Sequence, residues 1–289
     1  MCIKITAVGS NKLIADEVEL IVRRILGQTC NVMSRTSAEV TGHEDTDLYV
    51  CAITQKEPLS AKMSQEKLCV LDLRPTAQFF IDISHIPAGE TVYIFNSNKR
   101  YAKLLESMCG EHKIHQLNFI TVAYEDMPEN DVIDRLRQAK YIIGVGKHVE
   151  KEVLLSEKYR PYLRPDVTII GRTRMATMET ACTLIEQAQN IERQILAQEI
   201  SLLTEDLNNL SADDASYREK TIHLEKLLDK QLNAQPLTEH LLNSLAGQLS
   251  DQLYGETDAN TGYTNSNDLA DILQELDSTL GGMKPKLQD

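Results

Sequence analysis

The chain lacks several features by which common classes of protein are recognised. It has no run of about 18 apolar residues, so no membrane-spanning helix is expected. The segment 1–8 has neither the basic stretch nor the apolar run of a secretion signal. Lys and Arg number 30 against 43 Asp and Glu, and this net charge of −13 argues against broad nucleic-acid binding. We therefore expect a cytoplasmic protein with no membrane or nucleic-acid partner.

Motifs for nucleotides, metals and catalysis are missing as well. There is no G-x-x-x-x-G-K-[ST] loop, and Gly144-Val145-Gly146 is followed by Val149 where a dinucleotide fingerprint needs its third glycine. His112 and His115 are three residues apart, but the surrounding sequence opposes the helix that a metal pair would need. No catalytic triad can be read from the chain. We expect no cofactor, no metal and no catalytic residue.

Cysteine pairs of the C-x-x-C type are also absent. Several of the six cysteines lie inside apolar runs, which is typical of buried, reduced side chains. A chain of 289 residues with this spacing does not indicate a disulfide framework, and this again favours the cytoplasm. The cysteines are Cys2, Cys30, Cys51, Cys69, Cys109 and Cys182.

The first 174 residues alternate strand-like apolar runs with helical patterns. This alternation predicts an α/β fold with parallel sheets covered by helices. Pro87-Ala88-Gly89 separates two similar stretches, so two lobes are expected at about 1–86 and 90–172. The segment 76–86 suits either a strand or a short helix. The expected strands are 3–8, 30–34, 47–54 and 68–73 in the first lobe, and 91–95, 116–123, 141–143 and 166–170 in the second.

Polar and basic residues stand where several of these strands end. Ligands of parallel sheets bind beside the carboxyl ends of the strands, or between lobes. Turn residues there can hold an anion or cap the next helix, and the cations can hold a carboxylate or phosphate or lie in solvent. The predicted ligand is a small anion, and its candidate contacts are Ser10, Asn11, Arg74, Ser97, Asn98, Lys147, Arg172 and Arg174.

The composition changes from Met175 onward, where Glu, Gln, Leu and Ala dominate. Five apolar residues follow one another at spacings of four, three, four and three, which is the a/d spacing of a coiled coil. They are Leu196, Ile200, Leu203, Leu207 and Leu210. We expect residues 175–232 to form either a dimeric coiled coil, giving a homodimer, or an internal helical hairpin with residues 211–214 as a helix cap.

The last segment, 233–289, reads as amphipathic helices with a flexible linker. Residues 237–253 and 269–280 have helical apolar patterns, whereas 255–267 is rich in Gly, Thr, Asn and Asp. A short helix of this kind commonly docks on a protein partner.

Six segments of the first 190 residues or so follow one another in the order and at the pace of a known family. They are Ile3–Val8, Leu68–Pro75, Val92–Asn96, Tyr141–Gly146, Thr168–Gly171 and the helix Thr177–Glu192. In these segments the chain resembles the N-terminal sensory region of bacterial transcriptional activators of the propionate-catabolism-regulator type, which work with the alternative sigma factor N. The resemblance implies two flavodoxin-like lobes with a small metabolite bound between them. It does not extend to the ATPase and DNA-binding domains of that family, because this chain has no ATP-binding loop and no basic recognition helix.

These observations lead to one principal hypothesis and two alternatives. The first is a stand-alone metabolite sensor, not an enzyme, that passes its ligand state through the C-terminal coiled coil to a protein partner or a second copy, in transcriptional or signalling control. The second is an enzyme on the same two-lobed scaffold. The third is a structural adaptor that acts through residues 175–289.

Overall fold

The computed structural model describes residues 3–27, 30–210 and 215–232. Its α/β part contains two four-stranded parallel sheets, which confirms the predicted fold class at that level. Sheet order in the first lobe is β2-β1-β3-β4, and the register pairs Ile5 of β1 with Val32 of β2 and Leu48 of β3. The elements of this lobe are β1 (Ile3–Gly9), α1 (Lys12–Leu26), β2 (Cys30–Thr36), β3 (Leu48–Ala52), α2 (Lys56–Ser60) and β4 (Leu68–Leu71).

The second lobe repeats this arrangement. Its strand order is β7-β6-β8-β9, again with the first strand of the lobe inside the sheet and the second at its edge. Apolar side chains alternate between the two faces of β6, since Val92 and Ile94 enter one core and Tyr93 and Phe95 the other. The elements are α3 (Ala77–Ser84), β6 (Thr91–Asn96), α4 (Lys99–Glu111), β7 (Asn118–Ala123), α5 (Glu129–Gln138), β8 (Tyr141–Val145) and β9 (Thr168–Arg172).

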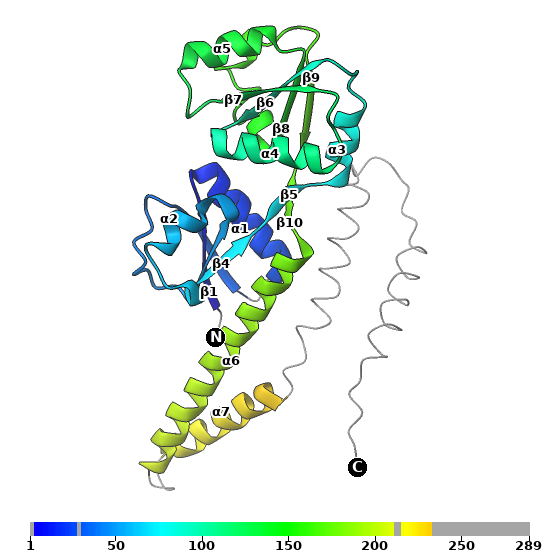
Figure 1. Cartoon of the computed structure of the whole chain (residues 1–289). Coiled ribbons are helices and arrows are strands. Elements are labelled where there is room, and N and C mark those ends of the chain that lie inside the picture. Colours follow the sequence, from blue (N-terminus) through cyan, green and yellow to red (C-terminus); the bar gives the residue numbers. More distant parts are fainter. Residues whose placement is uncertain (1–2, 28–29, 211–214, 233–289) are drawn as a thin grey trace, which may run out of the picture.

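Two short strands join the lobes. The chain passes from the first lobe to the second through β5 (Leu73–Pro75) and returns through β10 (Arg174–Ala176). These strands pair in antiparallel fashion, with Arg174 opposite Pro75 and Ala176 opposite Leu73. Figure 1 shows the pair between the two sheets. We refer to β5 and β10 together as the hinge strands.

The change of lobe falls at β5, ahead of the expected boundary near Pro87. The ambiguous segment 76–86 forms helix α3, and Phe79, Phe80 and Ile83 on one of its faces pack into the core beneath β6 and β8. Helix spacing of these three side chains explains why a helix forms there and why it belongs to the second lobe.

The long helix α6 (Met178–Asn208) completes the first lobe. Ala181, Leu184, Ile185 and Ala188 join the core formed by β1, α1 and β4. Thr177 caps the helix, since its Oγ1 accepts a hydrogen bond from the N–H of Thr180 at 3.5 Å. The lobe whose first strand begins at Ile3 is thus closed by a helix that begins only at Met178.

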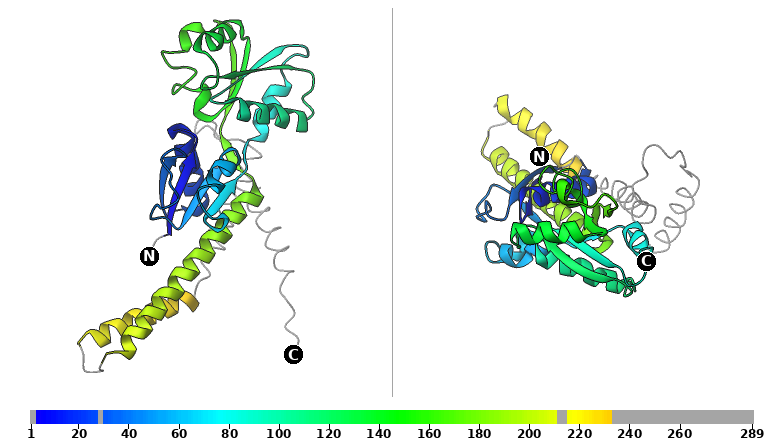
Figure 2. Two further views of the ribbon diagram at one scale, coloured as in Figure 1. Left: turned by 60° about the vertical axis from the view of Figure 1, so that its left-hand side comes forward. Right: turned by 90° about the horizontal axis from the view of Figure 1, so that it is seen from above.

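Helix α7 (Ala215–Leu232) folds back along α6. Ion pairs join Glu192 to Lys230 at 3.0 Å and Glu199 to His223 at 3.2 Å, so the two helices run antiparallel. Figure 2 shows them side by side below the lobes. Among the predicted seam residues Leu196 is buried, while Ile200, Leu203, Leu207 and Leu210 are half-buried. The coiled coil itself stays a prediction; the expected cap at 211–214 and the segment 233–289 lie outside the described residues.

Three cysteines of the two lobes lie in apolar surroundings. Cys51, Cys69 and Cys109 are buried and unbridged, and burial raises the pKa of their thiols to about 12. Within the described residues, every helix is too short or too polar to cross a membrane.

Candidate functional site

The carboxyl ends of the two sheets face each other. The Asn11 side chain, just after β1, donates from Nδ2 to Glu125 Oε1 at 2.8 Å, and Glu125 follows β7 of the other lobe. Gly146, after β8, lies against the Glu17 carboxylate of α1, because a Cβ added there would be 3.4 Å from Glu17 Oε1. We call this region the lobe junction; it comprises Asn11, Glu17, Asn96, Tyr101, Tyr124, Glu125, His148 and Arg174.

Equivalent asparagines begin the helix that follows the first strand of each lobe's sheet. Asn11 Oδ1 accepts a hydrogen bond from the Ile14 N–H at 3.0 Å, and Asn98 Oδ1 accepts one from the Tyr101 N–H at 2.8 Å. Both residues are extended helix caps, so capping is their observed role. Of their neighbours, Ser10 is exposed, whereas Ser97 is buried.

The centre of the lobe junction is a buried ion pair. Arg174 on β10 binds both carboxylate oxygens of Glu17, with Nε 2.9 Å from Oε1 and Nη2 on Oε2. Their side chains are 3% and 17% exposed, and the Arg174 guanidinium lies over the Tyr101 ring, 4.7 Å from its centroid. Burial acts to lower the pKa of Arg174, but Glu17 and Tyr101 outweigh it and the pKa is raised. One hinge residue therefore binds α1 of the first lobe and α4 of the second.

His148 is a second buried titratable group at the lobe junction. Its side chain is fully buried, and its Nδ1 lies 2.8 Å from the Tyr124 hydroxyl. Burial lowers the pKa of His148 to about 4, and the positive charge of Arg174 adds to this effect. Burial also raises the pKa of Tyr124. At neutral pH the pair is therefore an uncharged imidazole and a protonated phenol.

Three buried polar atoms at the lobe junction lack a partner with hydrogen-bond geometry among the described residues. They are Asn96 Nδ2, the Tyr101 hydroxyl and His148 Nε2. The Asn96 amide is oriented by Ser97, whose hydroxyl donates to Asn96 Oδ1 at 3.3 Å. Buried polar groups are almost always hydrogen-bonded, so these atoms indicate a place for a polar ligand group or an ordered water.

The other predicted basic residues are paired with nearby acids. Arg74 forms ion pairs with Asp72 at 2.9 Å and Glu111 at 2.8 Å, and Arg172 forms one with Asp82 at 2.8 Å. Lys147 lies 4.0 Å from Glu152. These basic side chains are about half exposed, whereas Arg174 is buried at the centre of the lobe junction.

The Gly144-Val145-Gly146 turn serves packing. A Cβ on Gly144 would lie 2.3 Å from Val149 Cγ1 and 2.8 Å from the Phe95 carbonyl oxygen, and a Cβ on Gly171 would lie 2.4 Å from Val149 Cγ2. Gly146 has a φ of 51°, which favours glycine. Val149 occupies the position at which a dinucleotide fingerprint needs its third glycine. Its side chain fills the space beside Gly144 and Gly171.

Sequence reasoning placed Asn11 and Arg174 in the site but missed several partners. Glu17 lies on an amphipathic helix, where an acid is usually in solvent. Tyr101 likewise lies on an amphipathic helix, α4, and its position there did not indicate a contact with Arg174. Glu125 lies in the turn after β7, where an acid is usually in solvent as well. Two positions at strand ends were the available signals in the sequence. Asn96 ends β6, and Lys147-His148 come shortly after β8.

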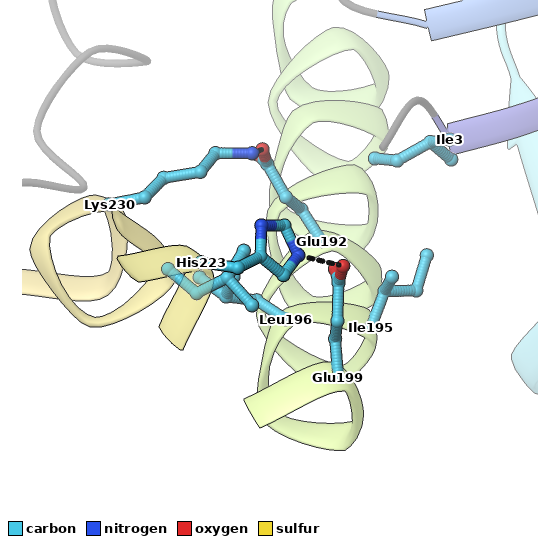
Figure 3. Close-up of a pocket in the computed structure, with 8 residues that line it drawn as sticks. Ile3, Glu192, Ile195, Leu196, Glu199, His223 and Lys230 are labelled. Carbon is cyan, nitrogen blue, oxygen red and sulfur yellow. Dashed lines mark hydrogen bonds and ion pairs between the residues drawn. The ribbon is translucent and has the colours of Figure 1, made fainter. Parts of the chain in front are cut away.

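A separate cavity lies at the foot of the first lobe, away from the lobe junction. It has a volume of about 110 Å³ and is formed where Ile3 of β1 meets α6 and α7. Figure 3 shows the Glu199–His223 pair and the Lys230 side chain among the residues that line it. Its apolar lining comes from Ile3, Ile195, Leu196 and Leu227. The charged side chains that line it bind each other, Glu199 with His223 and Glu192 with Lys230.

Comparison with known proteins adds no family. No family model matches the chain, and neither a curated protein nor a solved structure is significantly similar to it. In residues 3–27, 30–210 and 215–232, no group of three or more metal-binding side chains is found.

Proposed function

We propose that the protein is a small-metabolite sensor whose ligand binds at the lobe junction. The observation that carries this proposal is the position of Arg174. It lies on a hinge strand, binds one helix from each lobe, and is followed after two residues by Thr177, the cap of α6. Any ligand that changes how the lobes meet at Arg174 also acts on the start of α6.

The fold supports a ligand at this position. The strand orders β2-β1-β3-β4 and β7-β6-β8-β9 are compatible with two flavodoxin-like lobes, in which ligands bind at the carboxyl ends of the strands. The buried Arg174 and the unpartnered donor Asn96 Nδ2 suit a small anionic metabolite.

Helix α6 supplies the route to a partner. Its first half packs in the core of the first lobe and its second half pairs with α7. Rotation of the first lobe about the hinge strands would carry this helix pair with it. A protein partner, or a second copy of the chain, would read that movement in transcriptional or signalling control. Buried, unbridged cysteines are consistent with the cytoplasm as the place of action.

The proposal is tested by ligand binding followed by a conformational measurement. A thermal-shift panel of small carboxylates and phosphates identifies a binder, since ligand at about 100 times its Kd adds roughly 2.7 kcal/mol to the stability. Small-angle scattering and hydrogen exchange are then recorded with and without that binder. We expect a more compact particle and altered exchange at β5, β10 and the first turn of α6.

Two results would count against the sensor. Binding that leaves the scattering curve and the exchange of α6 unchanged separates the site from any output helix. Steady consumption of the bound compound, followed by NMR, favours the enzyme instead. As a control, Arg164→Ala removes an exposed ion pair with Asp166 on a surface turn, and it should alter neither binding nor exchange at the hinge.

A further inference from the structure

The Glu17 carboxylate has the geometry of a bound ligand. It meets Arg174 through both oxygens, in the two-bond arrangement by which arginine recognises carboxylates. We propose that Glu17 is a built-in substitute for the ligand's own carboxylate, and that the ligand binds by displacing Glu17 from Arg174. This inference rests on the proposed function and adds the chemical class of the ligand and the way in which it competes.

The cost of the pair argues against a purely stabilising role. Two charges taken out of water lose hydration, and buried ion pairs commonly contribute no more stability than apolar residues of the same volume. The burial of an arginine with two hydrogen bonds to one carboxylate, on a hinge strand, is explained if that arginine also binds a second partner, the ligand. Glu17 comes from the first lobe, so its release would remove the ion pair between α1 and Arg174 on β10.

Other buried polar atoms of the lobe junction indicate which further groups a ligand would carry. Tyr124 is protonated, and when its hydroxyl donates to His148 Nδ1 the proton of the neutral imidazole lies on Nε2. His148 Nε2 and Asn96 Nδ2 are then two buried donors for which the described residues supply no acceptor, while the Tyr101 hydroxyl interacts with the Arg174 guanidinium. A ligand that uses them carries oxygen acceptors. The structure therefore fits a small carboxylate with at least one further hydroxyl, carbonyl or carboxylate group.

Displacement keeps the charge balance of the lobe junction. The ligand carboxylate replaces the negative charge of Glu17 on Arg174, and Glu17 moves toward the solvent that its 17% exposed side chain already reaches. Gly146, which follows β8, places no side chain against the Glu17 carboxylate, since a Cβ there would lie 3.4 Å from Glu17 Oε1. The exchange needs no proton and leaves His148 neutral.

The test is the variant Glu17→Gln, which keeps the size of the side chain and removes its charge. Competition for Arg174 is then weaker, so acetate and succinate should bind about tenfold more tightly than to the native protein, a change in Kd that calorimetry resolves. Chloride at the same ionic strength serves as the reference for unspecific anion binding. The matched control is Glu19→Gln on the same helix, where Glu19 pairs with Arg23 at 2.8 Å outside the lobe junction; its affinities should equal those of the native protein.

Equal affinity of folded Glu17→Gln and native protein for acetate and succinate overturns the inference, as does an equal gain for chloride. Should Glu17→Gln fail to fold, Glu17→Asp keeps the charge but shortens the reach to Arg174, and a gain in acetate affinity is again required. Failure of the sensor function gives a different result from failure of the Glu17 displacement. If only the sensor function fails, Glu17→Gln still binds acetate more tightly, but no bound compound alters the hinge strands or α6.

Discussion

Asn11 and Glu125 form a direct hydrogen bond across the lobe junction, with Asn11 Nδ2 2.8 Å from Glu125 Oε1. The same asparagine caps α1 through its other side-chain atom, Oδ1. One residue thus stabilises a helix within its own lobe and fixes the distance to the other lobe. Its counterpart Asn98 caps α4, and its amide group donates to Ser97 of its own lobe. This difference allows the two roles to be separated.

Substituting Asn11 with Ala should lower the free energy of unfolding by about 1 kcal/mol through loss of the cap and should also loosen the lobes. Asn98→Ala should cost a similar amount with no change in lobe separation, and Glu125→Ala should loosen the lobes with little loss of stability. Urea unfolding and the radius of gyration from scattering measure the two effects. A radius that increases equally in all three variants would refute the assignment.

Substituting Arg174 with Met should destabilise the protein by about 3 kcal/mol, because Glu17 is left as an uncompensated buried charge. The double variant Glu17→Leu/Arg174→Met removes both charges and should recover most of that loss. Denaturant unfolding of both single variants and the double variant gives the coupling free energy between the residues. Additive losses would show that the two side chains do not depend on each other.

The stability should depend on pH through His148. Its pKa is lowered from 6.5 to about 4 in the folded protein, so between these values the unfolded chain takes up a proton that the folded protein does not. The stabilising contribution is therefore full above about pH 6.5 and is lost as the pH falls toward 4. Between about pH 7 and about pH 5 the loss amounts to about 2 kcal/mol.

The variant His148→Gln has no such proton uptake and should unfold with nearly the same free energy at both values of pH. Glu44 does not disturb this window. Burial acts to raise the pKa of Glu44, but hydrogen bonds from Tyr49 and Thr41 outweigh it and hold the pKa at about 2, so the stability that Glu44 contributes falls only at more acidic pH. A native protein whose unfolding free energy is flat from pH 7 to pH 5 would contradict the burial of a neutral imidazole.

Substituting Gly171 with Ala should destabilise the second lobe, since the new methyl group would lie 2.4 Å from Val149 Cγ2. Overpacking of this kind costs about 1–3 kcal/mol. Adding Val149→Ala should relieve it, because the close atoms around Gly171 belong to that one side chain. Gly144→Ala should be rescued less, since it also meets the Phe95 carbonyl oxygen at 2.8 Å. Melting temperatures of the two single glycine variants and the two double variants decide this, and equal rescue at both glycines would be the contrary result.

The periodicity of the chain was sufficient to predict the parallel sheets. Apolar runs such as 48–52 and 92–95 are buried on both faces and alternate with amphipathic helices, and this pattern depends on local sequence alone. The boundary between the lobes was harder to place. Pro87-Ala88-Gly89 is only a turn between α3 and β6, whereas the true crossing at β5 is marked by its pairing with β10, about 100 residues away.

The candidate site was predictable only in part for the same reason. Arg174 and Asn11 could be proposed because strand ends are visible in a sequence. Their partners Glu17 and Glu125 could not, since those contacts span 157 and 114 residues. Arg172 shows the converse: its neutralising partner Asp82 is 90 residues distant, so the sequence could not separate it from Arg174.

The place of α6 in the first lobe affects the order in which the protein can be completed during synthesis. The second lobe is one continuous stretch, from α3 to β9, and its core is whole once residue 172 has emerged. The first lobe is translated earlier, yet its core lacks Leu184, Ile185 and Ala188 until α6 leaves the ribosome. The N-terminal half therefore waits, partly uncovered, while the later half folds, and a nascent chain stalled near residue 175 would expose apolar surface to chaperones.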